Sequence, residues 1–119
     1  MEEEQKIMKK LEMIIRPEKL EDVKDTLNEM EIYGMTVTMV SGCGHQKGRK
    51  EMYRGSEISI NLLPKVKVET VVRDAVVDQL IKRITSLIKT GTVGDGKIFI
   101  YNVEDAVRIR TEERGDNAL

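Results

Sequence analysis

The sequence predicts a small α+β fold with the element order β-α-β, long connection, β-α-β. Three observations support it. Apolar residues alternate in several short segments, they recur at helical spacing in two others, and a glycine-containing stretch without apolar periodicity separates the halves. This order is the split βαβ, ferredoxin-like plan, in which the helices cover one face of the sheet. A length of 119 residues suits one such domain with a modest core.

The first half of the chain contains a strand, a helix and a second strand. Residues 10–16 alternate apolar and charged side chains, which is typical of a strand, and Pro17 then takes the favoured first position of a helix. The apolar stripe of this helix consists of Leu20, Val23, Leu27 and Met30. Gly34 ends the pattern, and the residues of 35–40 predict the second strand.

The second half repeats this order after a long connection. Residues 41–56 have almost no apolar periodicity, and a connection of about 16 residues without structure of its own is uncommon and often functional. Residues 58–72 resume a long alternation, in which Pro64 predicts an edge position or a bulge. Residues 74–89 carry apolar side chains at helical spacing, and 98–103 predicts the last strand.

The face of the sheet opposite the helices is expected to be half apolar. Ile14 and Val71 point to that face beside charged neighbours. Small domains with such a second face commonly cover it by forming oligomers, so we expect a homo-oligomer.

Composition excludes several classes of protein. The 20 basic and 21 acidic side chains give a net charge of −1, and four aromatic residues are too few for base stacking, so nucleic acid is not an expected partner. Cys43 is the only cysteine, which excludes an intrachain disulfide or a zinc knuckle and fits a reducing cytoplasm. No apolar run approaches the ~18 residues of a membrane span.

A compact anion site is predicted near the C-terminus. Gly94 and Gly96 permit a tight turn with exposed backbone N–H groups, and Lys97 adds an ammonium group. Arg108 and Arg110 are two residues apart, so in an extended chain both guanidinium groups leave the same face. Three cations and free amides suit a polyphosphate such as ATP, although two arginines on a solvated strand face remain an equally good interpretation of that pair.

A phosphate site also raises the alternative of a small phosphotransferase. Such an enzyme needs a positioned base and acidic ligands for its metal. His45 and Asp95 are the only candidates, and neither has a second acid at a useful spacing. The sequence therefore favours a binding protein over an enzyme.

Four motifs in order resemble the P-II nitrogen signal-transduction proteins: the loop QKGRKEMYRGSE, the strand LLPKVKVE, the turn GDGKIF and the closing RIRT. The resemblance runs from about Met8 to Leu119. It implies a trimer of ferredoxin-like subunits that is a regulator and not an enzyme. It also implies ATP or ADP in the clefts between subunits, with 2-oxoglutarate binding alongside MgATP.

The resemblance assigns roles to individual residues. The nucleotide-binding positions are Ile14, Thr36, Gly42, Gly44, His45, Glu69, Val71, Thr90, Gly94, Asp95, Gly96, Lys97, Arg108 and Arg110. The 2-oxoglutarate positions are Gln46, Lys65 and Gly94, and Gln46 is also the protein ligand of Mg²⁺. His45 stands where a phosphate-contacting arginine is frequent in the family, so it contacts phosphate more weakly or faces solvent.

The resemblance divides the chain into an N-terminal extension (1–7), expected to be disordered, and a P-II-like domain (8–119). Within the domain lie an effector loop (43–58), a phosphate loop (90–97) and a C-terminal loop (109–119). The charged tail from Thr111 is expected to stay mobile until something binds it.

The effector loop is the expected output of the protein. Its partner-binding residues are Tyr53, Arg54, Gly55 and Glu57. Arg54 matches the arginine with which one branch of the family blocks the pore of an ammonium channel, which implies a cytoplasmic protein with reversible membrane association. Glutamine synthetase or a nitrogen-responsive transcription factor are the alternative targets. Ile58 replaces the tyrosine that is uridylylated in many members, so no uridylylation is expected, and phosphorylation of Ser56 is not expected either.

Overall fold

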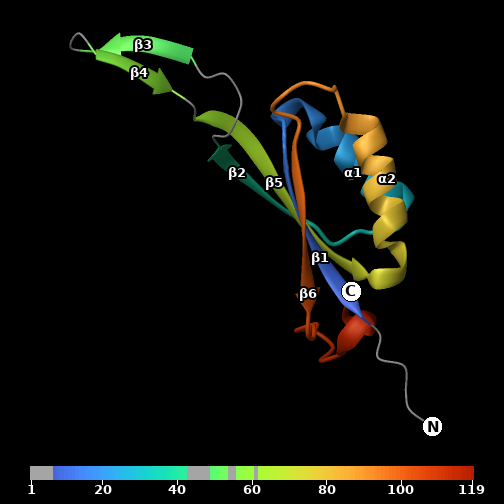
Figure 1. Ribbon diagram of the computed structural model, residues 1–119. Helices are drawn as coiled ribbons and strands as arrows, with labels where there is room; N and C mark the ends of the chain where they lie inside the picture. Colours follow the sequence, from blue (N-terminus) through green and yellow to red (C-terminus); the bar gives the residue numbers. More distant parts are fainter. Residues whose placement is uncertain (1–6, 43–48, 54–55, 61) are drawn as a thin grey trace.

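The computed structural model describes the backbone of residues 7–42, 49–53, 56–60 and 62–119, and the side chains of 7–42 and 62–119. It forms a two-layer α+β fold in which two helices lie on one face of a sheet (Figure 1). The sheet has the antiparallel order β2-β5-β1-β6, as the ferredoxin-like plan requires. The strands are β1 (Met8–Ile15), β2 (Thr36–Gly42), β5 (Leu63–Arg73) and β6 (Gly96–Val103), and the helices are α1 (Leu20–Glu29) and α2 (Val77–Ile88). The predicted fold class is confirmed.

The core lies between the helices and the sheet. Alternation along β1 and β5 directs one set of apolar side chains towards the helices, and Met13 pairs in register with Val68 on one side and Ile98 on the other. The fully buried side chains are Leu11, Met13, Ile15, Val23, Leu27, Val66, Val68, Leu80 and Ile84. Each helix is preceded by one 3₁₀ turn, η1 (Pro17–Lys19) and η2 (Asp74–Val76), so the expected helices 17–30 and 74–89 begin with a tighter turn.

The long connection differs from the prediction that it has no structure of its own. Strands β3 (Arg49–Tyr53) and β4 (Ser56–Ile60) pair as an antiparallel hairpin, which extends away from the sheet (Figure 1). The predicted continuous strand 58–72 is therefore two strands, β4 and β5. The sequence of 49–53 is mostly polar, so apolar periodicity could not reveal this strand.

Pro64 occupies a local edge of the sheet, as predicted. Strand β5 lies between β2 and β1, but the pairing with β1 begins only at Val66, opposite Ile15. At Pro64 the strand pairs with β2 alone, through Ser41. Its missing N–H group therefore removes no hydrogen bond from an inner ladder.

The chain after β6 turns back on itself. Arg108 N–H donates to the Glu113 carbonyl at 2.9 Å, and residues 109–111 form the turn. The prediction that Arg108 and Arg110 share an extended strand is therefore wrong. The tail, expected to be mobile, instead ends in a 3₁₀ helix, η3 (Gly115–Ala118), and Asp116 forms an ion pair of 3.2 Å with Arg73 on β5.

The face of the sheet opposite the helices carries an ion-pair network. Lys10 contacts Glu69 at 2.6 Å, Lys67 lies 3.8 Å from Glu69 and 4.0 Å from Glu12, and the Tyr101 hydroxyl donates to Glu12 at 3.1 Å. Because the carboxylate of Glu69 binds Lys10, the pKa of Glu69 is lowered and that of Lys10 is raised.

Ile14 and Val71 are half-buried between these charged groups, so the face is half apolar as expected. Within the part of the chain that the structure describes, no helix has the length and hydropathy needed to span a membrane.

Candidate functional site

The phosphate loop, residues 90–97, is organised by Asp95. Its carboxylate accepts hydrogen bonds from the backbone N–H groups of Thr90 (2.9 Å) and Gly91 (3.0 Å), and from the Thr90 hydroxyl. The Thr90 hydroxyl also contacts that of Thr92 at 2.7 Å. These bonds, that of the Thr90 hydroxyl foremost, lower the pKa of Asp95 to about 2. Asp95 is thus ionised at neutral pH, and its carboxylate links the end of the loop to its beginning at Thr90 and Gly91.

Two cations from neighbouring strands bind the backbone of the loop. Arg16, which follows β1, donates to the Val93 carbonyl at 3.0 Å and to the Thr92 hydroxyl at 3.1 Å. Lys65, near the start of β5, donates to the Gly94 carbonyl at 2.7 Å. Two consecutive carbonyl groups are therefore fixed by positive charges.

Gly96 fixes the junction between the loop and β6. Its φ is +105°, a conformation that side chains disfavour, and a Cβ atom added there would lie 1.9 Å from the Ile14 carbonyl oxygen. This close approach brings Lys97 into register opposite Ile14. Lys97 is exposed, and its side chain forms no ion pair or hydrogen bond with any residue that the structure describes. Its ammonium group is available to an anion.

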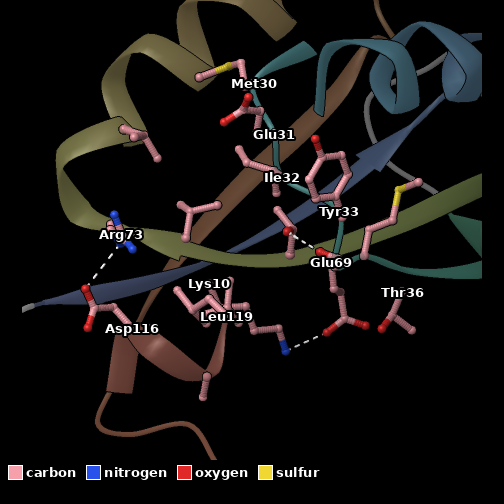
Figure 2. Close-up of a pocket in the computed structure, with 17 residues that line it drawn as sticks. Lys10, Met30, Glu31, Ile32, Tyr33, Thr36, Glu69, Arg73, Asp116 and Leu119 are labelled. Carbon is pink, nitrogen blue, oxygen red and sulfur yellow. Dashed lines mark hydrogen bonds and ion pairs between the residues drawn. The ribbon is translucent and has the colours of Figure 1, made fainter. Parts of the chain in front are cut away.

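A groove of about 880 Å³ lies on another part of the subunit, between β5, the turn after α1 and the C-terminal tail (Figure 2). Thr36, Glu69 and Val71, three of the residues predicted to contact the nucleotide base and ribose, line this groove. The Lys10–Glu69 ion pair crosses its floor (Figure 2). The lining of the groove is both apolar and hydrogen-bonding, and its volume is within the range of small-molecule sites.

The two predicted phosphate-binding arginines lie beside the tail. Arg108 donates to the Leu119 carbonyl at 2.9 Å and lies 3.3 Å from the Glu113 carboxylate. Leu119 also lines the groove, so Arg108 is close to the end of the groove formed by the tail. Arg110 is exposed in the turn 109–111, next to Ile109, of which 94% is exposed.

The predicted site therefore consists of two separate half-sites in one subunit. Lys97 is near the start of β6 and Arg108 lies beyond its end at Val103. The six residue steps from Lys97 to Val103 alone span ~20 Å. Figure 1 shows the phosphate loop and the C-terminal segment at opposite ends of β6. Likewise Lys65 and Glu69, four residues apart on β5, are separated by ~13 Å. One phosphate group cannot contact Lys97 and Arg108 of the same chain.

Comparison with known proteins decides the family. The sequence model of the family described as nitrogen regulatory protein P-II matches residues 8–113. The chain belongs to the P-II family. It is 52% identical over 112 residues to nitrogen regulatory protein P-II of Rhodospirillum rubrum and 51% identical to nitrogen regulatory protein P-II 1 of Escherichia coli K12; each alignment covers 94% of this chain and 100% of the relative.

Solved structures agree with this assignment. The fold is similar to that of B. subtilis GlnK, with a TM-score of 0.78, 39% identity, and coverage of 95% of this chain and 99% of that one. It is also similar to a B. subtilis GlnK–ATP complex, with a TM-score of 0.77, 34% identity, and coverage of 95% and 98%. As a P-II protein, this chain is a regulatory signal transducer and not an enzyme.

Several predicted site residues lie outside the described part of the P-II chain: Gly44, His45, Gln46, Arg54 and Gly55. For Tyr53, Ser56, Glu57 and Ile58 the structure gives only a position in the hairpin strands β3 and β4. Among the described residues, no cluster of His, Cys, Asp or Glu could hold a metal ion. The predicted Mg²⁺ contact through Gln46 remains a prediction.

Sequence reasoning missed one residue of the site, Arg16. It stands between an apolar strand and Pro17, where nothing in the local pattern distinguishes it from any solvated arginine. Only the register of β1 with β6, in which Ile15 pairs with Gly96, reveals that Arg16 lies opposite Asp95.

Proposed function

We propose that this P-II protein is a trimeric sensor that binds ATP or ADP in clefts between subunits. In each cleft the phosphate loop of one subunit, with Lys97, faces the groove and Arg108 of the next. The observation that carries the proposal is the separation of these two half-sites along β6, since an intersubunit cleft joins what a single chain keeps apart. The likeness to a GlnK–ATP complex supports ATP as the ligand.

Complementation between subunits tests this arrangement. Lys97→Gln and Arg108→Gln subunits are co-expressed with different affinity tags and purified on both tags, so that every trimer is mixed. Each homogeneous variant should lose ATP affinity, whereas each mixed trimer should regain one complete cleft, about one third of the wild-type stoichiometry. Mixed trimers that bind no better than either variant would refute a cleft shared between subunits.

We propose further that 2-oxoglutarate binds with MgATP beside the phosphate loop. Lys65 supplies a charge for one carboxylate and already lies against Gly94, the other predicted contact that is described. Mg²⁺ would be held by oxygens of ATP, of 2-oxoglutarate and of the Gln46 side chain, a donor set that suits this hard cation. Each ligand thereby completes the site of the other, which makes their binding cooperative.

Calorimetry distinguishes this mechanism from independent binding. 2-Oxoglutarate is titrated into protein with MgATP, with ADP and with no nucleotide. Heat in the MgATP titration alone supports the linked sites. Equal heats in all three titrations would contradict them, while leaving nucleotide binding by the trimer unaffected.

The proposed output is control of an ammonium channel by the effector loop, with Arg54 as the residue that enters the pore. The support is the match of residues 43–58 to the family pattern, and a guanidinium group on a flexible stem suits a narrow pore lined by carbonyls. Ligands alone would then govern release, because Ile58 offers no hydroxyl for uridylylation. A nucleotide adduct in the mass spectrum after incubation with a uridylyltransferase would contradict this.

Co-sedimentation with channel-containing membranes tests the output. Retention is expected in ADP and not with MgATP and 2-oxoglutarate, and Arg54→Gln should abolish it. Arg83→Gln is the matched control, because Arg83 pairs with Glu29 between the two helices and lies away from the loop. Equal retention under both ligand conditions, or none, would count against the channel and direct attention to glutamine synthetase or a transcription factor.

A further inference from the structure

The side chain of Arg16 contacts the phosphate loop at three residues. Its Nη2 atom donates to the Val93 carbonyl at 3.0 Å and to the Thr92 hydroxyl at 3.1 Å, and its Nε atom lies 3.4 Å from the Asp95 carboxylate. Its side chain is only 21% exposed. One guanidinium group thus binds three of the seven residues between α2 and β6.

The backbone around Arg16 holds this side chain in place. Ile15 is buried and pairs with Gly96, and continuation of that register by one residue sets Arg16 opposite Asp95. The Arg16 carbonyl accepts the Lys19 N–H at 3.0 Å in the first turn after β1, and Pro17 fixes the backbone between them. The guanidinium group therefore approaches the loop from a rigid element.

The two carbonyl contacts determine where the loop amides point. In a trans peptide the C=O group of one residue and the N–H group of the next point in opposite directions. Arg16 binds the Val93 carbonyl, so the Gly94 N–H is directed away from Arg16. Lys65 binds the Gly94 carbonyl, so the Asp95 N–H is directed away from Lys65. Two successive N–H groups are oriented before any ligand arrives, and such oriented amides are what a phosphate needs.

We propose that Arg16 is a positioning residue for the phosphate loop. It acts through the Val93 carbonyl, Thr92 and Asp95 and does not itself touch the nucleotide. This inference rests on the proposed nucleotide binding. It adds the residue that holds the phosphate loop in its binding conformation before the ligand arrives. Loss of Arg16 frees the loop, and the ligand must then order the loop as it binds.

Hydrogen exchange in the ligand-free protein measures this preorganisation directly. The amides of Thr90 and Gly91 both donate to Asp95, so their exchange reports whether the loop is closed. In Arg16→Gln these amides should exchange about tenfold faster or more, since charge-assisted hydrogen bonds are lost, while the melting temperature changes little. Arg83→Gln, with the same loss of charge on the helices, should leave them unchanged.

ATP titration completes the test. Arg16→Gln should bind ATP about tenfold more weakly than the wild type. Arg16→Lys can make only part of the contacts, so its ATP affinity should lie between those of the wild type and Arg16→Gln. Unchanged exchange in Arg16→Gln would overturn the proposal even if ATP affinity fell, because Arg16 would then act by direct contact. Faster exchange with wild-type ATP affinity would overturn it too. If wild-type protein binds no ATP, the proposed function fails and this inference with it, whereas faster exchange would still show that Arg16 holds the loop.

Discussion

Substitution of Gly96 by alanine should disrupt the phosphate loop more than the same substitution at Gly34 or Gly91. Two independent effects act there. The residue has φ of +105°, and the new Cβ would lie 1.9 Å from the Ile14 carbonyl oxygen and 3.0 Å from its carbonyl carbon. The atoms in the way belong to the backbone of β1, so no side chain can move aside.

The magnitude follows from two matched positions. Gly34 has open space and an ordinary φ, so Gly34→Ala should change the free energy of unfolding by less than about 0.5 kcal/mol. Gly91 has φ of +83° and equally open space, so Gly91→Ala isolates the backbone strain, about 1–2 kcal/mol. Gly96→Ala adds steric overlap to this strain, which raises the loss to about 2–5 kcal/mol.

Thermal unfolding at one fixed protein concentration measures the three variants. A loss of 1 kcal/mol corresponds to about 4 °C for a domain of this size, so Gly96→Ala should melt at least about 8 °C below the wild type. ATP affinity should fall as well, because Lys97 leaves its register opposite Ile14. If Gly96→Ala and Gly91→Ala have the same melting temperature, steric contact with β1 contributes nothing and the reasoning is wrong.

Three further predictions concern the charged groups. The pKa of Asp95 is about 2, below its ordinary value of 3.8, so its stabilisation of the loop is complete above about pH 4 and is lost as pH falls towards 2. An NMR titration of its carboxyl with a midpoint near 4 would contradict this. Glu113→Gln releases Arg108 and should tighten ATP binding up to about fivefold by calorimetry, whereas Glu112→Gln should not. Lys65→Met should abolish 2-oxoglutarate heats while ATP binding is reduced less; equal loss of both would place Lys65 at the nucleotide.

The sheet and its core could be predicted from the sequence because burial of one face imposes a pattern on the residues. Val66 and Val68 alternate with charged neighbours, and that alternation identifies both the strand and the face turned to the helices. The hairpin of β3 and β4 escaped prediction for the same reason. Strand β3 (RKEMY) is mostly polar and gives no apolar periodicity, and Ile58 and Ile60 of β4 belong to the alternation that predicts one long strand, 58–72.

The sequence names candidate site residues, but it does not give their positions within the subunit. The spacing of Arg108 and Arg110 fits a strand as well as the turn that the structure contains, because two charged residues carry no information on burial. Asp95 is predicted as a nucleotide contact, and the structure adds its hydrogen bonds to Thr90 and Gly91, which support the loop from within. The position of Arg16 beside the loop depends on the register between β1 and β6, a long-range property that local sequence does not encode.

Three of the charged groups that the ligand would contact already have partners in the isolated subunit. Arg108 binds Glu113 and the Leu119 carbonyl, Lys65 binds the Gly94 carbonyl, and Glu69 is paired with Lys10. Exposed ion pairs of this kind contribute about 1 kcal/mol or less each, so a polyphosphate with several charge-assisted hydrogen bonds can replace them. In the proposed intersubunit cleft, binding would then be an exchange of partners. Because the Glu113 and Leu119 contacts must open when Arg108 turns to phosphate, the tail should rearrange with occupancy, which gives the sensor a moving part distinct from its effector loop.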